Sequence, residues 1–172
     1  DWEMLWRLNP EAVRREIEAI YRINIWDKES FLYDRHANYY TGEFDPMPVR
    51  GTYIKHSGLF TQSFMFLFTK TGDRQHLDWA RKMSALYWQY RDPNTGLLPG
   101  YVHEGGGSTN CPWQLQLAYY MLEAAKLYPD PVVQQHGLDM VDTFLTYGFD
   151  KAKGAFAGEL DTATGTVKTV SE

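Results

Sequence analysis

The spacing of apolar residues along the chain predicts five helices, separated by polar segments that contain glycine and proline. Apolar side chains recur roughly every three to four residues within each helical segment, which is the period of an α-helix. The predicted helices cover residues 10–26, 57–70, 73–90, 112–128 and 131–147. We therefore expect an all-α fold, with a short β-hairpin in the segment that begins at residue 149.

Residues that favour helix starts support these boundaries. Asn and Asp side chains accept hydrogen bonds from the first free N–H groups of a helix, and proline fits the first helical position because it has no N–H. Such residues precede four of the helices, at Asn9, Asp73, Asn110 and Asp130. Gly72 fits a helix end. His76 and His136 fall within amphipathic helices, and we expect both to be solvated.

Short and long connections alternate along the chain. The long ones are residues 27–56, 91–109 and the segment from 149. In an up-and-down array of antiparallel helices, this alternation places the long connections on one face. The helices that follow long connections, 57–70 and 112–128, are apolar nearly all round, so we expect them to form an inner layer behind more amphipathic outer helices.

A short pattern recurs at the start of each long connection. An aspartate follows a helix, and after it come a few polar residues, a glycine or an aromatic residue, and an apolar exit. The aspartates are Asp27, Asp92 and Asp150. Their spacing of about sixty residues suits a helical hairpin plus a loop. The pattern therefore predicts a helical repeat protein, either an open solenoid or a closed toroid.

Composition narrows the classes of partner. Aromatic residues make up 16% of the 172 residues, and such rings either line carbohydrate sites or fill cores. The net charge of −5 and the lack of a Lys/Arg block argue against a nucleic-acid partner. No apolar run reaches the roughly eighteen residues of a membrane span. The single cysteine, Cys111, excludes an intrachain disulfide and a cysteine-based zinc cluster.

Two stretches, "TGDRQHLDWARKM" and "RDPNTGLLPGY", resemble the six-hairpin (α/α)6-toroid superfamily of carbohydrate-active enzymes. That superfamily includes glycoside hydrolases, polysaccharide lyases and sugar epimerases. The likeness covers roughly residues 9–165 and lies in the fold rather than in catalytic motifs. It implies an all-α toroid or partial toroid, a carbohydrate substrate, no cofactor, and a secreted or periplasmic protein.

The length of the chain departs from a full ring. Six hairpins of about sixty residues need roughly 360 residues, so 172 residues supply just under three. We expect residues 1–172 to be a single hairpin-repeat domain, either part of a larger toroid or a smaller helical array. A partial ring exposes apolar inner faces, and such surfaces favour self-association.

The first long connection is dense in polar and aromatic residues: Asp34, Arg35, His36, Tyr39, Tyr40, Glu43 and Asp45. In a sugar subsite, tyrosine faces stack on pyranose rings, Arg35 binds a carboxylate in bidentate fashion, and a carboxylate or the histidine transfers protons. The alternative is a surface loop in which Asp34 and Arg35 cap and pair locally.

Further candidates flank the starts of the two inner helices. Around the first start stand Arg50, Tyr53, Lys55 and His56. The helix dipole there disfavours a charged imidazole and suits His56 as a neutral proton acceptor. A capping or buried structural histidine is the alternative. His103 and Glu104 precede three glycines in the second long connection, and Trp113 and Gln114 open the next helix. Trp113 either stacks on a sugar or packs in the core.

Glu159 and Asp161 share one face of the predicted hairpin, as paired acids or, as we favour for Asp161, as a turn residue. No HExxH, clustered histidines or EF-hand loop is present, so no metal site is predicted.

The activity expected first is hydrolysis of a glycosidic bond, with two carboxylates drawn from Asp34, Glu43, Asp45, Glu104 and Glu159. β-Elimination on a uronate stays open, with a Tyr or His as base, and so does sugar epimerisation, which needs two opposed proton carriers. A non-catalytic module that binds a glycan or a partner chain is the alternative from another class. The expected catalytic residues are Asp34, His56, His103 and Glu104, and the expected substrate-binding residues are Arg35, His36, Tyr39, Tyr40, Tyr53, Trp113 and Gln114.

Overall fold

The computed structural model describes residues 1–34, 38, 40–41, 43, 54–101 and 108–170. Its helical elements are α1 (Trp2–Leu8), α2 (Pro10–Ala19), the π-helical η1 (Ile20–Asn24), α3 (Ile54–Thr71), α4 (Arg74–Trp88), α5 (Cys111–Leu127) and α6 (Pro131–Tyr147). Its strands are β1 (Ser108–Asn110), β2 (Phe149–Asp150), β3 (Ala155–Asp161) and β4 (Val167–Val170). All five predicted helices are present.

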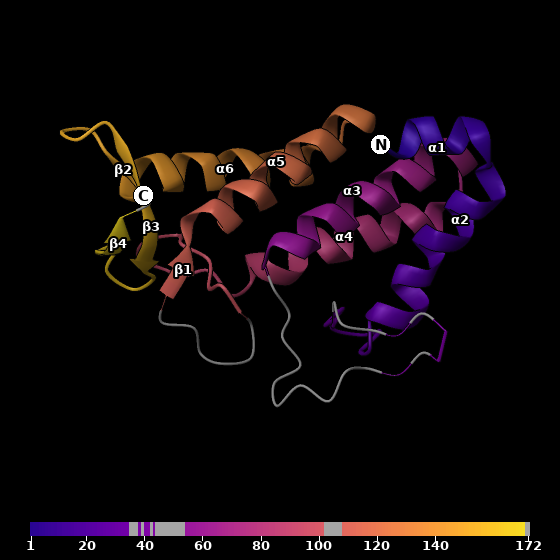
Figure 1. Cartoon of the computed structure of the whole chain (residues 1–172), viewed down its shortest axis with the longest axis horizontal. Coiled ribbons are helices and arrows are strands. Elements are labelled where there is room, and N and C mark those ends of the chain that lie inside the picture. The colour runs from indigo at the N-terminus through magenta and orange to yellow at the C-terminus, as the bar shows by residue number, and fades with distance from the viewer. Residues whose placement is uncertain (35–37, 39, 42, 44–53, 102–107, 171–172) are drawn as a thin grey trace.

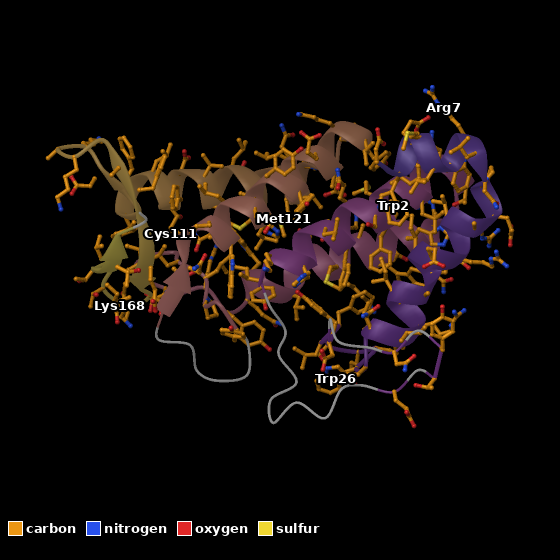
Figure 2. The ribbon with its side chains drawn as sticks, in the orientation of Figure 1. Trp2, Arg7, Trp26, Cys111, Met121 and Lys168 are labelled. Carbon is orange, nitrogen blue, oxygen red and sulfur yellow. The ribbon has the colours of Figure 1, made fainter. Side chains whose placement is uncertain are left out.

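Two antiparallel hairpins, α3–α4 and α5–α6, form the body of the protein (Figure 1). The inner helices α3 and α5 pack against each other, and each also packs against its outer partner. Met121 of α5 lies in this helical body, and Cys111 lies at the start of α5 beside the sheet (Figure 2). The predicted division into inner and outer helices therefore agrees with the observed packing.

The predicted caps hold the starts of the helices. The Asn9 side chain accepts from Ala12 N at 3.0 Å. The Asn110 side chain accepts from Trp113 N at 3.2 Å, and Asp73 and Asp130 cap α4 and α6 in the same way. Each cap satisfies N–H groups that have no partner inside the helix.

The recurring aspartate builds the same turn each time. The side chain of Asp92 accepts from the N–H groups two and three residues on, at 2.8 and 3.1 Å. Asp27 and Asp150 do the same at the starts of their connections. The residue four places after each aspartate has a positive φ angle: Phe31 (63°), Gly96 (74°) and Gly154 (63°). The repeat therefore encodes a turn.

The amino end of the chain differs from the prediction. The short helix α1 was not expected, and it is held by Trp2, whose Nε1 donates to Ser63 Oγ at 2.9 Å. The first predicted helix ends as α-helix at Ala19 and continues as the π-helical turn η1.

The sheet joins the second and third long connections. The predicted hairpin is β3–β4, and β1 pairs with β3 on its other edge, with Asn110 opposite Glu159. Thr95 Oγ1 also donates to Thr162 O at 2.6 Å. These bonds fix the two connections next to each other beside the start of α5.

The expectation that His76 and His136 are solvated is wrong. Their exposed fractions are 1% and 8%. His76 Nδ1 lies 3.0 Å from Thr71 Oγ1, and the His136 ring stacks on Trp88 with centroids 4.1 Å apart. Burial lowers the pKa of both histidines. A helical pattern counts histidine as polar, but the imidazole ring packs as an aromatic once its nitrogen has a partner.

Within the described ranges, none of the helices combines the length and the apolar character that crossing a membrane requires.

Candidate functional site

The starts of α3 and α5 lie beside the end of the second connection. Ile54 N, at the start of α3, donates to Gly100 O at 3.3 Å. The Tyr101 ring meets the Trp113 ring edge-on, with centroids 5.9 Å apart. We call this region the rim; it comprises residues 54–56, 97–101 and 111–114.

A cation and two aromatic rings face each other at the rim. Lys55 Nζ lies 4.9 Å from the centre of the Trp113 ring, which is the range of a cation–π contact. Trp113 is partly buried, and Asn110 fixes its backbone at the start of α5. Lys55 and Tyr101 stand in two stretches that the sequence singles out, but the sequence assigns neither of them a role. The signal that points to Lys55 is its position next to His56.

His56 lies on the first turn of α3, as predicted. Its ring is partly buried and lies 6.4 Å from the Phe60 ring. The amino ends of α3 and α5, helices of 18 and 17 residues, both point to this region. Their free N–H groups make the surroundings favourable for negative charge.

Gln114 is fully buried and ties the second connection together. Its Oε1 accepts hydrogen bonds from Leu98 N at 3.3 Å and from Thr109 Oγ1 at 3.4 Å. Leu98 precedes the undescribed residues 102–107, and Thr109 follows them. Its Nε2 has no hydrogen-bond partner among the residues placed in the structure. Gln114 therefore holds the two ends of the connection that carries His103 and Glu104.

Asp34 is 1% exposed. Its backbone N–H donates to Asn24 O at 2.9 Å, and its carbonyl accepts from Asn24 Nδ2 at 2.8 Å. Next to it, Tyr33 packs on Phe60 and hydrogen-bonds to Tyr87. Burial, with a contribution from Tyr33, raises the pKa of Tyr87. Asp34 is thus held through its backbone by Asn24 and follows the core residue Tyr33.

The remaining predicted site residues are placed as follows. Tyr40 is fully exposed. The other predicted positions, Arg35, His36, Tyr39, Asp45, Arg50, Tyr53, His103 and Glu104, lie outside the described residues.

The paired acids of the hairpin have different roles. Asp161 forms the same turn as the recurring aspartates: its carboxylate accepts from Ala163 N and Thr164 N, and Gly165 follows with a φ of 70°. A hydrogen bond from the Thr164 hydroxyl lowers the pKa of Asp161. Glu159 is partly buried opposite Asn110. The preference for Asp161 as a turn residue agrees with these contacts.

A second hollow lies further along α3 and α5, under α1. This groove of about 760 Å³ is lined by residues that include Trp2, Leu59, Phe66, Tyr119 and Tyr120. Over the described part of the chain, no three His, Cys, Asp or Glu side chains gather as a metal site would require.

No protein-family model matches the sequence, and no curated protein matches it. Solved structures do match. A D-mannose isomerase is similar over 94% of this chain, with 19% identity and a TM-score of 0.63. A cellobiose 2-epimerase from Bacillus thermoamylovorans matches over 92%, with 14% identity and a TM-score of 0.61. A GH76 α-mannanase from Bacteroides thetaiotaomicron matches over 72%, with 14% identity and a TM-score of 0.55.

This chain spans 45% of the mannose isomerase, 43% of the epimerase and 35% of the mannanase. The similar proteins are (α/α)6-toroid enzymes, so the expected resemblance is confirmed at the level of the fold. The chain therefore has the fold of a partial α/α toroid, with a small antiparallel sheet at its carboxyl end.

Proposed function

We infer that the chain forms part of an enzyme that acts on a mono- or oligosaccharide at the rim. The observation that carries this inference is the meeting of Lys55 from α3 with Trp113 from α5, whose ring also contacts Tyr101 of the second connection. His56 follows Lys55 on the first turn of α3. Aromatic rings contact the apolar faces of sugars, while ammonium and imidazole groups bind hydroxyls.

Proton transfer on a reducing sugar is the reaction that we favour. The isomerase and the epimerase resemble this chain along almost its whole length. In such a reaction a base removes the proton from C2 of an open-chain aldose. The same base returns the proton to C1 in an isomerisation, whereas an epimerisation needs a second proton carrier on the opposite face of C2. His56 would remove the C2 proton, and Lys55 would stabilise the negative charge that develops on the sugar oxygen.

Hydrolysis, which the sequence places first, is the second candidate, and the likeness to the mannanase favours it. It requires two carboxylates at the bond to be cleaved. At 1% exposure Asp34 is closed to a substrate in this conformation. The described residues therefore support a proton carrier more directly than they support an acid pair.

Product analysis separates these reactions. The protein is incubated in D2O with mannose, glucose, fructose and cellobiose, and separately with mannan, while ¹H NMR follows the C2 proton and a reducing-sugar assay follows chain cleavage. We expect loss of the C2 proton signal together with sugar interconversion. His56→Gln should lower kcat by about 10²- to 10⁴-fold with little change in the circular dichroism spectrum. New reducing ends without exchange at C2 would instead identify a hydrolase, and turnover unchanged in His56→Gln would contradict the role of His56.

A further inference from the structure

Strand β3 contains an acidic side chain that the fold itself does not use. Glu159 is partly buried, yet within the described part of the chain its carboxylate forms no hydrogen bond and no ion pair. Asp161, the other acid of the hairpin, closes a turn and pairs with Lys168. Withdrawing a carboxylate from water costs free energy unless it gains a partner, so the state of Glu159 needs an explanation outside the fold.

The strand register places Glu159 at the start of α5. It lies opposite Asn110 in the antiparallel pair of β1 and β3, and side chains at opposite positions share one face of a sheet, with Cβ atoms about 5 Å apart. Figure 1 shows β1 and β3 together beside the start of α5. Asn110 Oδ1 accepts from Trp113 N at 3.2 Å. The Asn110 side chain therefore reaches from the sheet to the rim, and Glu159 lies beside it.

The carboxylate of Glu159, and not only its backbone, lies near α5. Burial and, as a smaller cause, the charge of Glu159 raise the pKa of Cys111 to about 11. A charge has such an effect only on a group close to it. Cys111 is the first residue of α5, so the carboxylate stands next to the rim.

The two faces of the sheet differ in exposure. Thr109 and Leu160, the neighbouring pair of opposite residues, are 1% and 0% exposed. Successive side chains of a strand point to opposite faces, so Asn110 and Glu159 lie on the face turned away from this core. Both residues are partly exposed. A molecule bound at the rim can therefore reach them.

Polar groups continue across this face. Thr169 of β4 lies opposite Glu159 on the other edge of β3, next to a β-bulge, and is exposed. The Asn110 amide and the Thr169 hydroxyl donate to none of the described residues. We call Asn110, Glu159 and Thr169 the polar row. It offers an amide donor, a carboxylate acceptor and a hydroxyl over two strand spacings, about 10 Å, and the hydroxyls of a sugar pair with such a mixture of groups.

We propose that the polar row binds the second sugar unit of a substrate whose reacting unit lies at the rim. This inference rests on the proposed function, and it narrows the substrate from a mono- or oligosaccharide to a saccharide of two or more units. Trp113 contacts the reacting unit, and Glu159 accepts hydrogen bonds from hydroxyls of the next unit. Glu159 thus determines specificity and takes no part in proton transfer.

Binding of matched sugar alcohols tests the polar row. Sorbitol and cellobiitol, and likewise mannitol and mannobiitol, resemble open-chain sugars of one and two units, but they have no carbonyl group and cannot react. Isothermal titration calorimetry compares the two members of each pair. We expect at least one two-unit alcohol to bind about tenfold more tightly than its one-unit partner. Glu159→Gln should remove most of this difference and leave the Kd of the one-unit alcohol unchanged, because glutamine keeps the shape but loses the charged acceptor.

Two further variants complete the test. Asp142→Asn removes the same charge from the outer helix α6, where the carboxylate also has no partner among the residues that the structure describes, and it should leave every Kd unchanged. Thr169→Val removes the hydroxyl at the end of the polar row and should weaken only the two-unit alcohol, by about twofold to tenfold. It keeps the test available if circular dichroism shows that Glu159→Gln does not fold.

Equal affinity within both pairs, or no binding of any of the four alcohols, would overturn the proposal. So would a preference for two units that Glu159→Gln and Thr169→Val leave intact. Equal weakening of the one-unit and two-unit alcohols by Glu159→Gln would place the acid at the reacting unit and would also overturn it. Calorimetry with these alcohols does not depend on turnover, whereas the proposed reaction is judged by exchange at C2, so the two fail in different measurements.

Discussion

Lys55 Nζ lies 4.9 Å from the centre of the Trp113 ring, and this contact joins the first turn of α3 to the first turn of α5. The two residues lie 58 positions apart in the sequence, and the parallel packing of the inner helices brings them together. The contact lies one residue along α3 from His56, the proton carrier in the proposed reaction.

Replacing Trp113 tests the aromatic surface. Trp113→Leu should raise KM about threefold to tenfold with a smaller change in kcat, because an aromatic contact contributes roughly 0.5–1.5 kcal/mol beyond area burial. Trp113→Phe keeps an aromatic face and should stay close to the original KM. Steady-state kinetics on the sugar that the protein turns over checks this, and equal KM values for the two variants would argue against stacking.

Substitution of two glycines of the recurring turn distinguishes the cost of backbone strain from the cost of steric crowding. Gly154 has a φ of 63° and open space around it, so Gly154→Ala should lower the free energy of unfolding by about 1–2 kcal/mol. At Gly96, with a φ of 74°, a new Cβ would also lie 3.2 Å from Thr143 Oγ1. Urea denaturation should therefore show a larger loss for Gly96→Ala. A smaller loss at Gly96 than at Gly154 would contradict this ranking.

Asp130 links the start of α6 to α4. It is 2% exposed, caps α6 through Val132 N and Val133 N, and accepts from Arg81 Nε at 2.8 Å. Burial works to raise the pKa of Asp130, but the hydrogen bond from Arg81 and those from the backbone outweigh it, so the pKa is lowered.

We expect Asp130→Ala to lower the free energy of unfolding by about 2–4 kcal/mol, since the cap and the ion pair are both lost. Asp130→Asn keeps an oxygen for the cap and should lose less. Chemical denaturation of both variants measures the difference, and a larger loss for Asn than for Ala would show that the cap is not the main contribution.

The buried histidines predict a loss of stability in mild acid. Burial lowers the pKa of His76 and of His136 in the folded protein, so below the ordinary value of about 6.5 the unfolded chain binds protons that the folded chain does not. Their contribution is complete above pH 6.5 and falls as the pH drops toward the folded pKa. Each imidazole adds at most about 1.4 kcal/mol per pH unit to this slope.

His136→Gln should flatten the fall of Tm between pH 7 and pH 5 relative to the unsubstituted protein. Calorimetry at a series of pH values measures the slope of Tm against pH. Because both proteins carry the same carboxylates, the difference between their slopes reports the contribution of His136. Parallel pH profiles would mean that His136 titrates alike in the folded and unfolded states.

Elements that are held by interactions between residues close together in the chain could be predicted from the sequence. The helix caps and the recurring aspartate turn depend on side chains a few residues from the backbone groups that they bind, so their spacing is visible in the chain. The helix α1 could not be read in this way, because its seven residues are held by the distant Ser63 and Phe66.

The site was predicted less completely, for a related reason. As expected, helix starts contain His56, Trp113 and Gln114. The adjacent residues Trp113 and Gln114 differ in exposure, however, because Gln114 is fully buried and Trp113 is only partly buried. The contact between Lys55 and Trp113 depends on how two helices pack, which no local pattern records. The same limit explains why His76 and His136 were placed in solvent.

The central claim is that sugar binds at the rim, and a crystal structure of the protein with the sugar that it turns over tests this most directly. We predict a sugar ring in van der Waals contact with Trp113 and a hydroxyl within hydrogen-bond distance of His56. A sugar bound instead in the groove under α1 or on the outer helices, with the rim unoccupied, would contradict it.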